Sequence, residues 1–533
     1  MSSANNNLDS ILTSIGEFGK FQCFLVFLII TVSTINFFST VTYIFETTPV
    51  NHRCKILDCD SESNQFNPQW LINAVPFNNG KPSRCTKFQH NPNSTCTIEN
   101  FNNDTVEKCN EYIYETTEKS IMQDFNLHCD ENIKMLTAVG TISGVGKFIG
   151  LPITGYISDR YGRKTVMIWS TVLAGILGII RSFSTSYAFF VTTEFIEASV
   201  GAGIYSSVYI LGSEFVGPKK RALITTFQFL SFGMGSIILG VTAWALQSWR
   251  ILLRVLYSFY LLILFYYWLL PESVRWLISQ KKEQEVVTIL RKIAQVNGKE
   301  IPQGKLEELF RNTSDSSETT KIPLRTLFKS FTLTIRCILC SLLWIISLFI
   351  YYGLTVTSTT LSGHRYLNYV LTAMIELPAY IISFFIIDKL GRRVLLFTAY
   401  ALACTSSIAY ILVPLNIYWI KLCLYLLSKF GITLAIPAIY MISNEMFPTS
   451  VRQTLLSVCS MFGRIGNTLA PQLILLQEVW KYLPLVLFTI LSAIACSITF
   501  ILPETKGILL PDTIEEAENI GKRKKKTGNN GML

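Results

Sequence analysis

The stretch Gly155-Tyr-Ile-Ser-Asp159-Arg160-Tyr-Gly162-Arg163-Lys164 ends one hydrophobic segment, and Asp388-Lys-Leu-Gly391-Arg392-Arg393 ends another in the second half of the chain. Two further motifs recur at nearly the same offset. Glu214 with Arg221 is repeated by Glu445 with Arg452, and Pro271-Glu272-Ser273 is repeated by Pro503-Glu504-Thr505. Three unlike motifs that recur in one order and at one spacing indicate a duplicated architecture.

The composition is typical of a membrane protein. Half of the 533 residues are hydrophobic and only 15% are charged, whereas a soluble chain of this length carries more charge. A helix needs about 20 apolar residues to cross a bilayer, and the sequence offers about twelve such runs. They lie at 21–42, 134–157, 165–183, 187–212, 223–245, 251–270, 331–354, 366–387, 394–413, 418–443, 453–474 and 482–502. The pattern predicts an all-α polytopic membrane protein with twelve transmembrane helices in two pseudo-symmetric six-helix halves.

Hydrophilic segments define the predicted domain organisation. A polar N-terminus (1–20) precedes a first bundle (21–270) that includes a large loop (43–133); a linker (271–330), a second bundle (331–502) and a basic tail (503–533) follow. Lys and Arg are concentrated in alternate short loops and in the tail, so the positive-inside rule predicts that these loops and both termini are cytoplasmic. No cleavable signal peptide is expected before the first span. Topology accounts for the net charge of +10, and no nucleic-acid partner is expected.

The large loop between the first two spans is predicted to be extracellular. It holds six of the 13 cysteines, and an even number in an oxidising compartment indicates three disulfides, although sequence alone does not choose their connectivity. Zinc binding has little support because Cys-x-x-Cys spacing is lacking, and no metal or cofactor is expected. The loop also carries the glycosylation acceptors Asn93 and Asn103. The cysteines are Cys54, Cys59, Cys85, Cys96, Cys109 and Cys129.

The repeated motifs are hypothesised to form a gate on each half. Gly155, Gly162 and Gly391 would let helix ends approach closely, while Arg160 and Arg163 could pair with an acid such as Glu214. Ion pairs near water break without unfolding a bundle, which suits a seal that opens and closes. The alternative is that the basic residues only fix the orientation of the chain in the membrane. That alternative explains the charge, but it does not explain the repeated Asp, Gly and Glu residues.

Several motifs resemble one transporter family. The twelve spans and the Gly-x-x-x-Asp-Arg-x-Gly-Arg-Lys loop resemble the major facilitator superfamily. The large Cys-rich loop and five short motifs narrow the resemblance to the organic cation, organic anion and carnitine transporter family, solute carrier family 22. These motifs are Thr48-Pro49 with His52-Arg53-Cys54, Pro271 to Leu277, Tyr351-Tyr352-Gly353-Leu354, Glu445-x-Phe447-Pro448-Thr449, and Pro503 to Gly507 leading to Leu510-Pro511-Asp512-Thr513-Ile514. Membership implies plasma-membrane transport of small organic ions and leaves the substrate open.

Charged residues inside the predicted spans are candidates for substrate binding, because an ionisable group in mid-membrane is costly. Glu376 and Arg464 each lie about 15 Å from the outer end of a span at 1.5 Å per residue. Arg464 could bind a carboxylate or sulfate, and Glu376 could bind an ammonium group. Alternatively, the two side chains neutralise each other.

The resemblance bears on the substrate class. Arginine at position 464 is typical of anion and carnitine carriers, where cation carriers have aspartate. Glu376 is typical of cation or carnitine carriers, and anion carriers usually have lysine in place of Tyr380. Pro437 stands where cation carriers tend to have an acid. The mixture resembles the carnitine branch most, which favours a zwitterionic substrate.

The first half has its own charged set within the spans: Lys147, Glu194 and Glu197. A structural pair between Lys147 and Glu197 is the preferred hypothesis, and a direct role in substrate or proton binding is the alternative. Aromatic faces suit amines through cation–π attraction, and Gln228 is a plausible polar contact. The aromatic candidates are Tyr351, Tyr352, Phe227 and Phe232, with Tyr352 the best placed.

These observations predict a plasma-membrane transporter that moves small organic ions by alternating access and performs no covalent chemistry. Carnitine-like zwitterions are the first choice of substrate, organic cations the second, and exchange of organic anions an alternative. A solute sensor with the same fold that does not transport is the rival from another class. The expected partners are the organic ion, the lipid bilayer, and a coupling ion (sodium or proton) or a counter-substrate. The protein is expected to be a monomer or a weak homo-oligomer.

Overall fold

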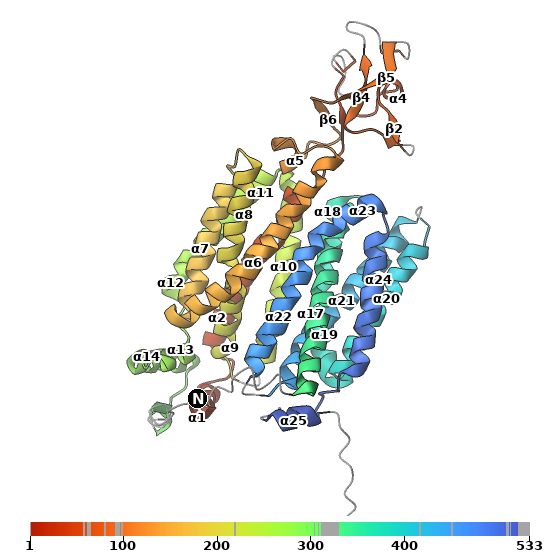
Figure 1. The fold of residues 1–533 in the computed structure, drawn as a ribbon. Helices are drawn as coiled ribbons and strands as arrows, with labels where there is room; N and C mark the ends of the chain where they lie inside the picture. The colour runs from red at the N-terminus through yellow and green to blue at the C-terminus, as the bar shows by residue number, and fades with distance from the viewer. Residues whose placement is uncertain are drawn as a thin grey trace, which may run out of the picture.

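The computed structural model consists of two helical bundles side by side, with a small β-rich domain projecting from one end (Figure 1). We call the end near that domain the disulfide end, and the opposite end, around Gly162 and Gly391, the motif end. The described residues are 2–520 except 57–58, 61–64, 79–80, 91–95, 98–99, 218–219, 303, 307–308, 311–329, 415–416, 449–450, 508–510 and 512.

The N-terminal half is built from α2, α3 and α6 to α12. Its helices are α2 (Lys20–Val41), α3 (Tyr43–Glu46), α6 (Ile133–Tyr161), α7 (Arg163–Arg181), α8 (Tyr187–Gly201), α9 (Ile204–Glu214), α10 (Arg221–Leu246), α11 (Trp249–Leu262) and α12 (Tyr266–Leu269), with η4 (Ile263–Phe265) between the last two. Short breaks within three spans, such as the one between α8 and α9, divide one membrane crossing into two helices. The predicted first half is therefore present as six crossings.

The C-terminal half repeats this arrangement. Its helices are α17 (Phe331–Thr357), α18 (Arg365–Met374), α19 (Glu376–Leu390), α20 (Arg392–Leu412), α21 (Tyr418–Met446), α22 (Arg452–Leu469), α23 (Leu473–Val479) and α24 (Leu483–Ile501), with η5 (Ser358–Thr360) and η6 (Ala470–Gln472). Close packing within this half occurs where small residues meet. A Cβ atom at Gly431 would lie 2.8 Å from the carbonyl oxygen of Ala399, which shows how closely α20 and α21 approach.

Eleven stretches of the described residues are long and apolar enough to cross a membrane. The twelfth crossing, α22 continued by η6 and α23, is more polar than the others because it carries Arg464, Asn467 and several hydroxyl side chains. A helix that faces the centre of the molecule on one side has less need of apolar residues than one surrounded by lipid. The predicted twelve-helix, two-half fold is confirmed.

Short strands and disulfides form the projecting domain. The strand β1 (His52–Cys54) pairs with β6 (Tyr112–Tyr114), β2 (Phe77–Asn78) with β3 (Lys81–Pro82), and β4 (Thr86–His90) with β5 (Phe101–Lys108), all antiparallel. The six predicted cysteines form three disulfides, namely Cys54–Cys109, Cys59–Cys96 and Cys85–Cys129. Because the third bond crosses the other two in sequence, the domain is held together although its hydrophobic core is small.

The predicted glycosylation sites fall in the same domain. Asn103 is exposed on β5, where a glycan would meet no steric obstacle, whereas Asn93 lies outside the described residues. His90 lies beside Cys59 and Cys96, but both sulfurs are already joined in a disulfide. The cluster is therefore a packed disulfide and offers no thiolate ligands to a metal ion.

Short helices cover the motif end: α1 (Ser2–Ser14), α13 (Val274–Ser279), α14 (Glu283–Asn297) and α25 (Ile514–Asn519). Asp9 on α1 accepts hydrogen bonds from both Arg221 and Arg275, each at 2.7 Å. Asn297 at the end of α14 accepts a hydrogen bond from the backbone N–H of Phe21 at 3.1 Å. These contacts tie the N-terminal segment and the linker to the N-terminal half.

Candidate functional site

The repeated motifs build the same helix junction twice. In the C-terminal half, Gly391 has φ +98° and the Glu504 carboxylate accepts hydrogen bonds from the backbone N–H groups of Arg392 and Arg393 at 3.0 and 3.1 Å. A carboxylate at a helix N-terminus satisfies free N–H groups and the helix dipole. A Cβ atom at Gly391 would lie 2.8 Å from this carboxylate. Glycine is therefore required both for its backbone conformation and for the close approach.

The N-terminal half repeats the junction with Gly162 and Glu272. Gly162 has φ +102°, and Glu272 accepts from the backbone N–H groups of Arg163 and Lys164 at 2.9 and 3.0 Å. The residue after each capping glutamate is also equivalent. Ser273 donates its hydroxyl to Glu214, and Thr505 donates to Glu445 at 2.6 Å. The three motifs predicted to be duplicated therefore form one network in each half.

The arginine contacts differ between the two networks. Arg392 bridges Asp388 and Glu445, both at 3.0 Å. Arg163 instead pairs with Asp159 at 2.8 Å. The hypothesised ion pair of these arginines with Glu214 is not formed among the described residues: Ser273 donates to Glu214, and Arg163 acts on that carboxylate only from a longer distance. Arg160 lies over the ring of Tyr161, 5.6 Å from its centroid.

Arg221 and Arg452, the arginines that follow Glu214 and Glu445 in the repeated motif, also have their own partners. Arg221 binds Asp9, at 2.7 Å. Arg452 donates to the carbonyl oxygens of Phe447 and Pro511 at 3.1 and 3.5 Å. These contacts fasten the N-terminal helix to one half and the C-terminal segment to the other. All ion pairs found at the motif end among the described residues join groups of the same half or the linker.

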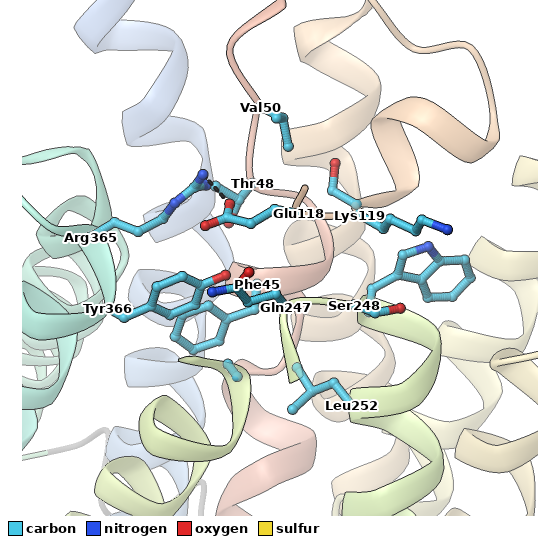
Figure 2. Close-up of a pocket in the computed structure, with 13 residues that line it drawn as sticks. Phe45, Thr48, Val50, Glu118, Lys119, Gln247, Ser248, Leu252, Arg365 and Tyr366 are labelled. Carbon is cyan, nitrogen blue, oxygen red and sulfur yellow. Dashed lines mark ion pairs between the residues drawn. The ribbon is translucent and has the colours of Figure 1, made fainter. Parts of the chain in front are cut away.

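At the disulfide end the two halves are in direct contact. Figure 2 shows Arg365, the first residue of α18, forming an ion pair with Glu118 of the N-terminal half, while Tyr366 stacks on Phe45 with ring centroids 5.7 Å apart. We call the interface between the two halves the seam. Deeper in it, Ser236 donates a hydrogen bond to Tyr369 at 3.1 Å. These contacts close this end of the space between the halves.

The glycines of α6 show how the seam changes along its length. Cβ atoms at Gly140 and Gly144 would collide with Pro471 and Thr468 of the C-terminal half, at 2.6 and 2.8 Å. Gly155 lies on the same helix face three turns further on, yet a Cβ atom there would meet nothing within 4 Å. The expectation that Gly155 allows a close approach of helix ends is therefore wrong for this state. The halves touch at the disulfide end and diverge towards the motif end.

Arg464 faces the middle of this seam. It is half-buried, and its charge interacts with Lys147 and with the hydroxyl groups of Tyr205, Tyr352 and Tyr440. Within the described residues no carboxylate lies at ion-pairing distance from Arg464. A guanidinium group with no anionic partner at this depth is available to an anionic ligand.

Glu376 does not neutralise Arg464, contrary to one hypothesis from the sequence. Its carboxylate pairs with Lys429 at 2.9 Å and accepts a hydrogen bond from Tyr351 at 2.7 Å, and both charged side chains are fully buried. Lys429 also lies 3.5 Å from the centroid of the Tyr351 ring and donates to Thr355 at 2.7 Å. Sequence reasoning missed Lys429, although a lysine inside the predicted span 418–443 was a visible signal.

The predicted pair of Lys147 and Glu197 is not formed. Lys147 donates to the carbonyl oxygen of Ser39 at 2.9 Å. Glu197 accepts from Arg181 and from Tyr257, at 3.1 and 3.0 Å. Arg181 lies at the end of the predicted span 165–183 and outcompetes Lys147 because it is closer and makes several bonds at once. It was missed because an arginine near a span end usually reaches the membrane surface.

The remaining candidates fall into two groups. Tyr380 donates to Tyr351 at 3.3 Å and stacks on Phe229 at 5.2 Å, so it belongs to the Glu376 group. Tyr352 lies beside Arg464. Gln228 is buried, and its amide donates to the carbonyl oxygen of Tyr205 at 3.3 Å.

Two predicted aromatic residues have mainly packing roles. Phe227 packs against Val26, Val216 and Ile224, away from the charged residues. Phe232 contacts Tyr205 and Phe37 with ring centroids 5.1 and 5.7 Å apart, so it supports the wall next to Arg464.

Comparisons with known proteins agree with this architecture. The family model "Sugar (and other) transporter" matches residues 94–517. Solute carrier family 22 member 1 of Bos taurus is 30% identical over 97% of this chain and 94% of its own length. Solute carrier family 22 member 2 of Homo sapiens is 32% identical over 77% of this chain and 74% of its own length. An organic cation transporter protein of Drosophila melanogaster is 28% identical over 89% of this chain and 83% of its own.

Solved structures show the same fold at low identity. The xylose transporter from E. coli, in a partially occluded inward-open conformation, has a TM-score of 0.62 at 16% identity, covering 91% of this chain and 99% of that one. A proton:xylose symporter bound to 6-bromo-6-deoxy-D-glucose gives a TM-score of 0.60 at 16% identity, covering 94% and 100%. The chain is a multi-pass membrane transporter of organic ions, not an enzyme, and it belongs to solute carrier family 22 of the major facilitator superfamily.

Proposed function

We propose that the protein moves small carboxylate-bearing organic ions across the plasma membrane by alternating access, with carnitine-like zwitterions as the preferred substrates. The observation that supports this most is the unpaired guanidinium of Arg464 between the two halves. Arginine binds a carboxylate through two parallel hydrogen bonds. The Lys147 side chain interacts electrostatically with Arg464 and so lies near the same position.

The charge of Glu376 is already compensated, which changes the expected binding mode. Lys429 neutralises Glu376, so an ammonium group gains less from this acid than the sequence suggested. The aromatic rings beside Arg464 offer a different site for a quaternary amine, because cation–π attraction works without a counter-charge. A zwitterion would place its carboxylate on Arg464 and its ammonium group against Tyr352 and Tyr440.

Organic anions are the second candidate. Arg464 has no acid at ion-pairing distance in the described part of the chain, and this favours substrates with negative charge only. Simple cations are the least favoured, because they would approach the like charge of Arg464 in a medium of low dielectric constant. This order differs from what the name of the Drosophila relative, an organic cation transporter protein, would suggest.

The topology and the gates belong to the same proposal. With the motif loops and both termini in the cytoplasm, the state closed at the disulfide end is inward-facing. The seal at the motif end would form when the two networks approach each other, and the residues Gly155, Asp159, Arg160 and Arg163 would then contact the C-terminal half. Each charge at this end lies near water and finds solvent when a contact breaks, so the seal can open at low cost.

Uptake into proteoliposomes tests the substrate. We expect labelled carnitine to accumulate and a permanent cation, tetraethylammonium, to be transported poorly. Arg464→Ala should lower carnitine uptake at least about tenfold, since a charge-assisted bidentate contact contributes roughly 1.5 to 3 kcal/mol. Glu376→Gln should have a smaller effect on binding. Arg291→Ala, an exposed arginine on α14, is the matched control. Cation uptake that survives loss of Arg464, together with no uptake of carnitine or an aromatic anion, would overturn the proposal.

A further inference from the structure

A group of buried charges in the N-terminal half has one negative charge too many. Arg181 meets three carboxylates: Glu46 at 3.1 Å, Glu197 at 3.1 Å, and Glu194. These four side chains are 0 to 1% exposed. Lys147 is the other cation that acts on the group. Three ionised carboxylates would therefore face two cations inside the membrane.

Such an imbalance is expensive where water is excluded. An uncompensated charge at this depth costs several kcal/mol, and a buried carboxyl group usually avoids that cost by binding a proton. One bound proton makes the five side chains neutral as a group. In the described part of the chain, the other groups that contact or act on the carboxylates are neutral. They are Thr42 beside Glu46, and Tyr257 and Tyr260 of α11 beside Glu197.

The contacts indicate which carboxyl groups share the proton. The Oε2 atoms of Glu194 and Glu197 both meet the same nitrogen, Nη1 of Arg181, whereas Glu46 binds Nη2. Two carboxylates that converge on one donor repel each other, and a shared proton relieves that repulsion. Each of the three glutamates has one buried carboxylate oxygen without a hydrogen-bond partner among the described residues: Oε2 of Glu46, Oε2 of Glu194 and Oε1 of Glu197. A proton on one of the two carboxyl groups, Glu194 or Glu197, would supply a missing hydrogen bond.

We propose that the Glu194 and Glu197 carboxyl pair binds a proton, and that this proton is transported together with the substrate. The proton binds one carboxylate oxygen on the side from which the substrate enters and leaves to water on the other side, so only one O–H bond forms and breaks. The pair is closed to water in the present state, which allows exchange only in another conformation.

Lys147 links the proton to the substrate site. It interacts with both Glu197 and Arg464. When the carboxyl pair is deprotonated, its negative charge stabilises Lys147 and repels an approaching carboxylate. When the pair holds a proton, Lys147 and Arg464 attract the substrate carboxylate more strongly. Because coupling between two bound ligands is reciprocal, substrate binding also favours proton binding. This second step rests on the function proposed above.

Two measurements on the full chain test the inference. In proteoliposomes with the membrane potential clamped, carnitine entry should acidify the interior, and its accumulation should shift about tenfold per unit of pH gradient at one proton per substrate. Glu194→Gln, which imitates the protonated group, should abolish the acidification while carnitine counterflow remains measurable. Glu283→Gln, an exposed glutamate of α14, should behave like the wild type. Carnitine uptake without acidification, or acidification that survives in Glu194→Gln, would overturn the inference.

Infrared spectroscopy of the purified protein separates this inference from the proposed substrate. The wild type at pH 7 should show the C=O band of a protonated, buried carboxyl group, and Glu194→Gln should lose it. If carnitine and anions are not transported but the band is present and lost in the variant, the proton site stands and the proposed substrate fails. If the band is missing from the wild type, the proton site is refuted whatever the substrate.

Discussion

Lys429 balances Glu376, the buried acid that the described residues place in the centre of the C-terminal half. Its ammonium group binds Glu376, Thr355 and the face of Tyr351 at once. Removing one member of a buried ion pair leaves the other charge uncompensated, which costs roughly 3 to 5 kcal/mol. Replacing both members with neutral groups avoids that cost.

This asymmetry gives a stability prediction. Lys429→Met should lower the melting temperature of the detergent-purified protein strongly, and Lys429→Met with Glu376→Gln should restore much of the loss. Glu376→Gln alone should also destabilise, because Lys429 is then left without its anion. A double variant that melts lower than Lys429→Met alone would contradict the pairing. Lys292→Met, on the exposed α14, is the control.

His128 makes the disulfide-bonded domain sensitive to acid. Its ring stacks on Tyr112 with centroids 4.0 Å apart and bonds the Tyr114 hydroxyl at 2.8 Å. Burial and the nearby His52 lower the pKa of His128 to about 4. The unfolded domain therefore binds more protons than the folded one between pH 4 and about 6.5. Stability is complete above about pH 6.5 and is lost as the pH falls towards 4.

Hydrogen exchange can measure this dependence. Amides of β1 and β6 should lose about 2 kcal/mol of protection between pH 7 and pH 5 after correction for intrinsic exchange rates. His128→Asn should start from a lower stability and change little over the same range. Equal slopes for wild type and variant would exclude His128 as the titrating group.

At the scale of the elements, the sequence was sufficient for the helices and the duplicated motifs but not for their partners. The spans follow from hydrophobic length, and the glycine, glutamate and arginine positions follow from the repeat. Ser273, the partner of Glu214, and Lys429, the partner of Glu376, could not be predicted, because each partner lies far from its glutamate in the sequence. Depth in the membrane is readable from the sequence; the direction in which a side chain points around its helix axis depends on packing. This is why the sequence left open whether Glu376 neutralises Arg464, and the contacts of Glu376 with Lys429 and Tyr351 decide against that alternative.

The two helix junctions provide an element-scale prediction. Gly391→Ala should destabilise the protein by about 1 to 3 kcal/mol, because φ +98° with ψ +158° is a backbone region that essentially only glycine adopts, and by about 1 kcal/mol more because the Glu504 cap must move. Gly298→Ala is the control for a left-handed glycine in open space, since Gly298 has φ +66° and ψ +35° and nothing within 4 Å of its Cβ position. Melting of both variants in the same detergent measures the difference. Equal losses would show that neither the capping contact nor the backbone conformation of Gly391 costs more than an ordinary left-handed turn.

At the scale of the whole molecule, the seam between the halves sets the conformational state. Contacts at the disulfide end hold it closed, and the spacing of Gly140, Gly144 and Gly155 shows the divergence towards the motif end. If the two halves rock as rigid bodies about a central site, the disulfide end opens and the motif end closes. The equilibrium between the states should therefore respond to a single contact at the disulfide end, where the halves meet.

The Glu118–Arg365 pair is the contact to test. It is mostly buried, with side-chain exposures of 13 and 20%, and it joins the two halves across the cavity in Figure 2. Losing about 1 to 2 kcal/mol here would change the ratio of the two states roughly five- to thirtyfold. Glu118→Gln should therefore lower the maleimide labelling of a cysteine introduced by Gly155→Cys, because the motif end closes when the disulfide end opens.

The parent protein without Gly155→Cys corrects for labelling of native cysteines. The charge swap Glu118→Arg with Arg365→Glu should restore labelling, since it rebuilds the pair. Labelling that is unchanged in Glu118→Gln would show that the aromatic contacts of Phe45 with Tyr366 and Tyr369 hold the seam closed without the ion pair.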